Sequence, residues 1–158
     1  MTLWRFCSEV FFAGLGSTAF SLIFHVPARY YPRCGLTGAA GWLVYIALKG
    51  ALGALTATFF ATLAVVLISR FSSVQLRCPV TIFLISGIFP LVPGLGIYQT
   101  AYALVEGDLT GAGLTGFETV KLAAAMVLAI LVAVNVFVSA LPSSLTKYDM
   151  SATKLYSI

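Results

Sequence analysis

Long apolar runs, interrupted only by single charges, prolines and glycines, dominate this sequence and restrict it to structures that are stable in lipid. Of the 158 residues, 60% are hydrophobic and only 9% are charged, whereas soluble domains carry about 25% charged residues. The mean hydropathy is +1.02. Because so few charges leave little room for a solvated surface, the composition predicts an all-α integral membrane protein.

The apolar runs are long enough to predict several membrane crossings. A bilayer core about 30 Å thick is crossed by about 20 helical residues. We predict a bundle of five transmembrane helices and a short cytoplasmic tail at residues 143–158. The predicted spans are residues 6–26, 36–48, 53–69, 80–105 and 118–141. The second span is only about 20 Å long, so whether it crosses fully depends on a snorkelling Lys49 or a thinner bilayer.

The distribution of lysine and arginine favours five spans over four. These residues concentrate in cytoplasmic loops. Five spans place six of them on one side and three on the other, whereas four spans divide them five to four and decide nothing. We therefore predict a multi-pass protein of the cell inner (plasma) membrane, with its N-terminus outside and its C-terminus in the cytoplasm. The loop at residues 106–117 is then expected to be external, flexible and slightly acidic.

Several function classes have no support in the sequence. The net charge is only +4 and no basic run exceeds two residues, so no nucleic-acid partner is expected. One histidine and three scattered cysteines do not form a metal-ligand set, and no cofactor motif is present. No nucleophile lies beside a base, and no carboxylates are paired within a span, so we do not expect an enzyme.

The fourth predicted span contains residues that interrupt a helix. Pro90 and Pro93 lack N–H donors, and Gly94 and Gly96 follow them closely. Irregular backbone survives in lipid only where it is buried in protein or lines a wet cavity. We therefore predict a break at this P-x-x-P-G turn, near the middle of the span, and a new helical segment that begins after Gly94.

The N-terminus of that new segment is a predicted substrate site. Its first N–H groups lack helical partners and its dipole end is positive, so it can bind a carboxylate at mid-membrane. The predicted substrate-binding residues are Pro90, Pro93, Gly94, Leu95, Gly96, Tyr98 and Gln99. The alternative is a proline kink that binds nothing.

Two other polar residues lie within or beside predicted spans. His25 and Asn135 are candidates for a proton or polar relay. The alternatives are an interfacial histidine and an asparagine that joins packed helices. Glycines also recur at Gly35, Gly38 and Gly41. They allow close packing, either inside this chain or against another subunit.

The run RCPVTIFLISGIFPLVPGLGIYQTAYALVEGD, residues 77–108, resembles the threonine/serine exporter family. The family's proline-bearing helix, with a P-x-x-P-G turn and a following tyrosine region, is matched by Pro90, Pro93, Gly94 and Tyr98. The resemblance extends over residues 8–142, and AFSLIFHVPARY resembles the family's first helix and its exit into a basic loop. It corresponds to the C-terminal half of the full-length exporter, which also exists as a separate small membrane subunit (YjjB-like).

This resemblance implies a function that composition alone does not reveal. The family exports small hydrophilic carboxylates, which are threonine and serine in one branch and succinate in a branch with split subunits, with the proton gradient as the expected driving force. It implies a larger multispan subunit as partner, together with membrane lipid and a small carboxylate substrate. Two alternatives stay open: a homomeric channel or carrier built as a higher oligomer, and an assembly subunit that does not itself transport.

Overall fold

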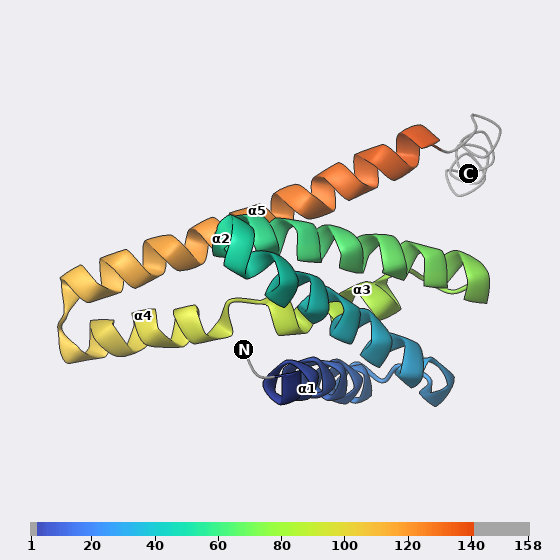
Figure 1. Cartoon of the computed structure of the whole chain (residues 1–158), viewed down its shortest axis with the longest axis horizontal. Helices are drawn as coiled ribbons and strands as arrows, with labels where there is room; N and C mark the ends of the chain where they lie inside the picture. Colours follow the sequence, from blue (N-terminus) through green and yellow to red (C-terminus); the bar gives the residue numbers. More distant parts are fainter. Residues whose placement is uncertain (1–2, 141–158) are drawn as a thin grey trace, which may run out of the picture.

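The computed structural model describes residues 3–140, and all of its regular elements are helical. The prediction of an all-α architecture is therefore confirmed. The elements, labelled in Figure 1 where there is room, are α1 (Leu3–Ile23), the 3₁₀ turn η1 (Ala28–Tyr30), α2 (Tyr31–Leu76), α3 (Thr81–Ile88), the 3₁₀ turn η2 (Phe89–Leu91), α4 (Gly94–Glu106) and α5 (Leu109–Ala140). The predicted tail at residues 143–158 and the predicted end of the fifth span at residue 141 lie outside the described residues.

The helix α2 consists of two segments that meet at Gly53. There the backbone has φ 81° and ψ 168°, a conformation that essentially only glycine adopts without strain. Figure 1 shows the chain doubling back at this bend. Each segment has about 22 residues and is about 33 Å long, enough to cross a bilayer core. The predicted second and third spans are thus parts of longer helical segments that meet directly.

Residues 28–35 lie between the first two predicted spans, where the resemblance implies a basic loop, but in the structure they are helical. The 3₁₀ turn η1 leads directly into α2, and Pro32 occupies the first turn of α2. Proline is tolerated there because the first N–H groups of a helix have no intrahelical partner. This addition lengthens the short stretch predicted at residues 36–48.

The number of candidate spans depends on how the bends are counted. Three stretches are long and apolar enough to cross a membrane, namely Trp4–Ile23, Ala28–Leu76 and Leu109–Val136. The bent pair of α3 with η2 and α4 makes a fourth if it is counted as one span. This count takes all of α2 as a single stretch. The prediction of five spans requires its two segments to cross separately, and it stays a prediction.

The prediction of a flexible loop at residues 106–117 is wrong, because α5 already begins at Leu109. Gly107, with φ 81°, ends α4. Its N–H donates to Leu104 O at 3.2 Å, and the Asp108 N–H donates to Ala103 O at 2.9 Å, the Schellman pattern of a helix terminus. Asp108 Oδ1 then accepts the Gly111 N–H at 2.9 Å and caps α5. The fifth helix therefore starts nine residues before the predicted span at 118.

Small residues allow α1 and the two segments of α2 to approach closely. A Cβ atom on Gly38 would lie 1.8 Å from Ser17 Oγ of α1, and one on Gly41 would lie 2.4 Å from Val65 Cγ2. Neither position has room for a larger residue, so these glycines serve packing within the chain. The large apolar side chains on the outer faces of the helices are mostly exposed, as expected for contact with lipid.

We expect Gly38→Ala to destabilise the fold, because the added methyl group would overlap Ser17 and force α1 away from α2. Overpacking of this kind costs about 1–3 kcal/mol. Thermal unfolding of the chain in mild detergent would measure the change. Gly16→Ala is the matched control, since a Cβ there meets nothing within 4 Å. Equal unfolding midpoints for the two variants would contradict the packing described here.

Candidate functional site

The break in the fourth apolar stretch lies between Leu91 and Gly94, at the residues from which it was predicted. The axes of the segments before and after it differ by 53°. Val92 is extended, with φ −59° and ψ 128°, the conformation that a following proline imposes on the residue before it. Pro93 cannot donate a hydrogen bond that would continue the preceding helix. The two prolines thus account for the break.

Glycine contributes less to this break than the sequence suggests. Gly94 has no positive φ, and a Cβ atom built on it meets nothing within 4 Å. Its backbone would therefore accept another residue. What Gly94 provides is open space in front of the first turn of α4.

The first turn of α4 presents free N–H donors. The Gly94 N–H donates to Val92 O at 2.7 Å, and the Ile97 N–H donates to Pro93 O at 3.1 Å. Within the described chain, the N–H groups of Leu95 and Gly96 have no backbone acceptor. Two donors at the positive end of a helix dipole form an environment that favours an anion.

A cavity of about 760 Å³ lies beside this turn. Every long helix contributes to its wall, together with the turn η2. The lining includes residues 90–96 and Gln99 from the broken stretch, Glu9 from α1, Trp42, Tyr45, Lys49 and Thr58 from α2, and Leu122 from α5.

Six of the seven predicted substrate-binding residues line the cavity: Pro90, Pro93, Gly94, Leu95, Gly96 and Gln99. Tyr98 is the exception. Its side chain is 64% exposed and stacks on Tyr102, with ring centroids 6.1 Å apart. The two tyrosines are one turn apart on the outer face of α4.

The cavity lies toward the N-terminal end of α1 and the bend of α2. Glu9 belongs to the second turn of α1, and Lys49 lies one turn before the bend at Gly53. On α5, by contrast, Leu122 lies well inside the helix. Leu122 can line the cavity from inside α5 because α4 and the first part of α5 extend beyond the bend in α2, as Figure 1 shows. The predicted location of the break at mid-membrane stays a prediction.

His25 lies outside this cavity and ends α1. Its backbone is left-handed, with φ 53°. The His25 N–H donates to Leu22 O at 3.1 Å, and the Val26 N–H donates to Ser21 O at 3.0 Å, again a Schellman pattern. The position therefore has a structural explanation, and a relay through the imidazole stays a prediction.

Asn135 also lies outside the cavity. Its Nδ2 donates to Leu131 O at 2.8 Å, one turn earlier in α5, and the residue is exposed. Its amide hydrogen bond is thus local to the helix. No described residue of another helix forms a hydrogen bond with it.

Sequence reasoning missed the charged residues of the cavity. Glu9 is partly buried, and Lys49 is exposed with its Nζ 5.4 Å from the centroid of the Tyr45 ring, within the range of a cation–π interaction. The Trp42 Nε1–H is also buried without an acceptor in the described chain. The signal was present, because a charge inside an apolar run is by default a functional candidate. The sequence predicts only a snorkelling role for Lys49.

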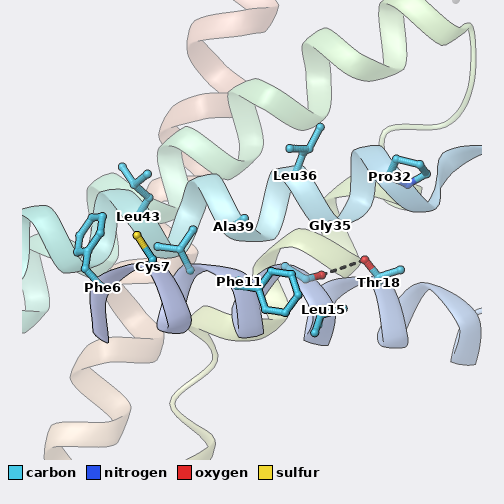
Figure 2. Close-up of a pocket in the computed structure, with 12 residues that line it drawn as sticks. Phe6, Cys7, Phe11, Leu15, Thr18, Pro32, Gly35, Leu36, Ala39 and Leu43 are labelled. Carbon is cyan, nitrogen blue, oxygen red and sulfur yellow. Dashed lines mark hydrogen bonds between the residues drawn. The ribbon is translucent and has the colours of Figure 1, made fainter. Parts of the chain in front are cut away.

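A second cavity, of about 550 Å³, lies between α1 and the first segment of α2 (Figure 2). Its wall is mostly apolar, with Phe6, Phe11 and Leu36 among the labelled side chains. The Thr18 hydroxyl already donates to Gly14 O at 2.9 Å. This cavity suits an apolar chain better than a charged solute, so the cavity at the break is the candidate site.

We expect Gly96→Ala to weaken the contact of α4 with α5, because the new Cβ atom would lie 2.3 Å from Thr119 Oγ1. Adding Thr119→Ala should restore part of the lost stability by removing that hydroxyl. The unfolding midpoint in detergent measures both effects, and Gly94→Ala, which meets nothing within 4 Å, is the control. Purely additive losses in the double variant would show that the two residues do not clash.

Comparison with known proteins identifies the family. Residues 9–136 match a family model described as Threonine/Serine exporter, ThrE. A probable threonine/serine exporter of Mycobacterium tuberculosis (strain ATCC 25618 / H37Rv) is 28% identical over 104 residues, which are 65% of this chain. The match spans only 20% of that relative's length. No solved structure matches the chain. Because the family model covers most of the sequence, the chain belongs to the threonine/serine exporter family.

Proposed function

We propose that this chain is the membrane subunit of a two-component secondary exporter for small carboxylates. Its substrates are threonine and serine or, in the alternative, succinate-like dicarboxylates, and the proton gradient drives export. A larger multispan subunit completes the transporter. Family membership supports an export function, and the cavity at the helix break is the single observation that supports a substrate site in this chain.

The proposed substrate contacts follow from the first turn of α4. The substrate carboxylate accepts hydrogen bonds from the N–H groups of Leu95 and Gly96, and its charge is stabilised by the helix dipole. Gln99, one turn further on, can donate through its side-chain amide. The cation of Lys49 lines the same cavity and favours an anionic group. Pro90 and Pro93 keep the turn open, because a continuous helix would use these N–H groups itself.

The need for a partner is supported by the exposure of α4. This helix has no buried residue in the described chain, although it forms part of the cavity wall. Helices of a larger subunit would cover α4 and enclose the solute path, which a small bundle does not enclose by itself.

We further propose that the two segments of α2 cross the bilayer separately, which makes five spans. With the N-terminus outside, the bend at Gly53 and the turn at Gly107 both lie outside, and the turn between α2 and α3 lies in the cytoplasm. The cavity then lies toward the outer side of α1 and α2. This topology places the chain in the cell inner (plasma) membrane.

The topology predicts which positions react with a membrane-impermeant maleimide in whole cells. In a background without the three native cysteines, Leu52→Cys and Leu109→Cys should be labelled, because both positions are exposed and lie outside in this topology. Val74→Cys, also exposed, should be labelled only after permeabilisation. Labelling of all three positions from the same side would contradict five spans.

The proposed site predicts that export requires the break in the helix at Pro90 and Pro93. In the double variant Pro90→Ala and Pro93→Ala, the N–H groups near Gly94 can join a continuous helix and no longer bind substrate. We expect efflux of labelled threonine, serine or succinate from preloaded cells to fall at least about tenfold, the effect of losing about 1.4 kcal/mol of binding. Pro32→Ala, outside the cavity at the start of α2, should keep normal efflux.

The same variants separate the alternatives. If the Pro90→Ala and Pro93→Ala double variant accumulates normally and shows unchanged efflux, the proposed substrate site does not lie in this chain. A lower amount of the larger subunit, with transport per complex intact, would instead indicate an assembly role. Mild-detergent purification of the chain followed by mass spectrometry tests the partner directly. Recovery of this chain only with copies of itself would favour a homomeric carrier.

A further inference from the structure

The cavity at the helix break contains one charge of each sign. Glu9 of α1 is the only carboxylate in its described wall, and Lys49 of α2 is the only cation. Neither forms an ion pair with a residue of the described chain. Two opposite charges thus line one cavity without neutralising each other.

A monocarboxylate or a dicarboxylate would leave this arrangement incomplete. The N–H groups of Leu95 and Gly96 and the cation of Lys49 all favour a negative group. Glu9 would then have no positive partner, and a second carboxylate in the cavity would be repelled by it. An unpaired charge that is partly removed from water is costly, and Glu9 is partly buried.

A zwitterion matches both signs at once. With its carboxylate at the first turn of α4, its ammonium group would lie in the cavity that the Glu9 carboxylate also lines. Charge-assisted hydrogen bonds between an ammonium group and a carboxylate are stronger than neutral ones. The volume of about 760 Å³ falls in the range of pockets for ligands much larger than a small amino acid. The cavity volume therefore distinguishes weakly between candidate substrates, and the charges in the cavity wall are the stronger criterion.

We infer that Glu9 recognises the ammonium group of an α-amino acid and thereby selects zwitterionic substrates over dicarboxylates. This inference rests on the proposed export function of the same cavity. It assigns Glu9 as a specificity-determining residue of that cavity.

The test measures uptake of radiolabelled L-threonine into inside-out vesicles of the native membrane, energised with a proton gradient, that contain the chain and whatever partner accompanies it. Unlabelled L-threonine, succinate and 3-hydroxybutyrate serve as competitors. The last compound is threonine without its amino group. The variants are Glu9→Gln, which keeps the shape and removes the charge, Glu9→Asp, which keeps the charge, and Glu118→Gln. Glu118 lies outside the cavity and pairs with Lys121 at 2.6 Å, so it is a matched control.

We expect Glu9→Gln to raise the KM for threonine roughly tenfold or more and to leave inhibition by 3-hydroxybutyrate unchanged or stronger. Glu9→Asp should fall between this variant and the wild type, which also covers the case that Glu9→Gln does not accumulate. Glu118→Gln should behave as the wild type. A purely structural role of Glu9 would instead weaken the binding of all three competitors together.

Three contrary results have different meanings. If the wild type takes up threonine and Glu9→Gln does so with the same KM, the assignment of Glu9 is wrong while the exporter function stands. If wild-type vesicles take up no more threonine than vesicles that lack the chain, the proposed function and this inference fail together. Stronger competition by succinate than by threonine in the wild type would also overturn the inference.

Discussion

The missing amide hydrogens of Pro90 and Pro93 are the constraint on which the candidate site depends. In lipid each backbone polar group needs a partner, and a proline removes the donor that would continue the helix. Val92 becomes extended as a consequence. α4 then begins anew at Gly94 with two N–H groups that no described backbone acceptor uses. The cavity lies where these groups remain available.

The surrounding helices hold this break by close contacts rather than by a large apolar core. Ser21 Oγ of α1 donates to Ser86 Oγ of α3 at 3.2 Å, and Ser86 is 1% exposed. Interhelical hydrogen bonds and small residues are the usual means of helix association in membranes. Gly87 of α3 is packed in the same way, since a Cβ there would lie 2.7 Å from Thr37 Cγ2. α3 is thereby fixed against α1 and α2, while α4 departs from it at the break.

The chain is thereby divided into two parts that both line the cavity. α1, α2 and α3 form a closely packed unit that carries Glu9 and Lys49. α4 and the first part of α5 extend beyond the bend of α2 (Figure 1), and α4, which packs against α5, has no fully buried residue in the described chain. A substrate in the cavity would contact both parts at once. The proposed partner would then act on the outward face of α4, next to the substrate-binding turn.

The sequence by itself determined the helical class, the break at the prolines and six of the seven predicted residues of the cavity wall. These follow from local chemistry, because hydropathy and proline geometry act within a few residues. The start of α5 was also locally encoded, in the Gly107–Asp108 pair, but these residues equally suit a loop.

Only the tertiary structure decided which charged residues share the cavity. Glu9 and Lys49 are far apart in the sequence, and their approach depends on close contact of α1 with α2 through Gly38 and Ser17. The angle of the bend at Gly53 and the exclusion of Tyr98 from the cavity were decided at the same level. Helix rotation and the bend angle depend on contacts between distant segments, and no local pattern specifies them.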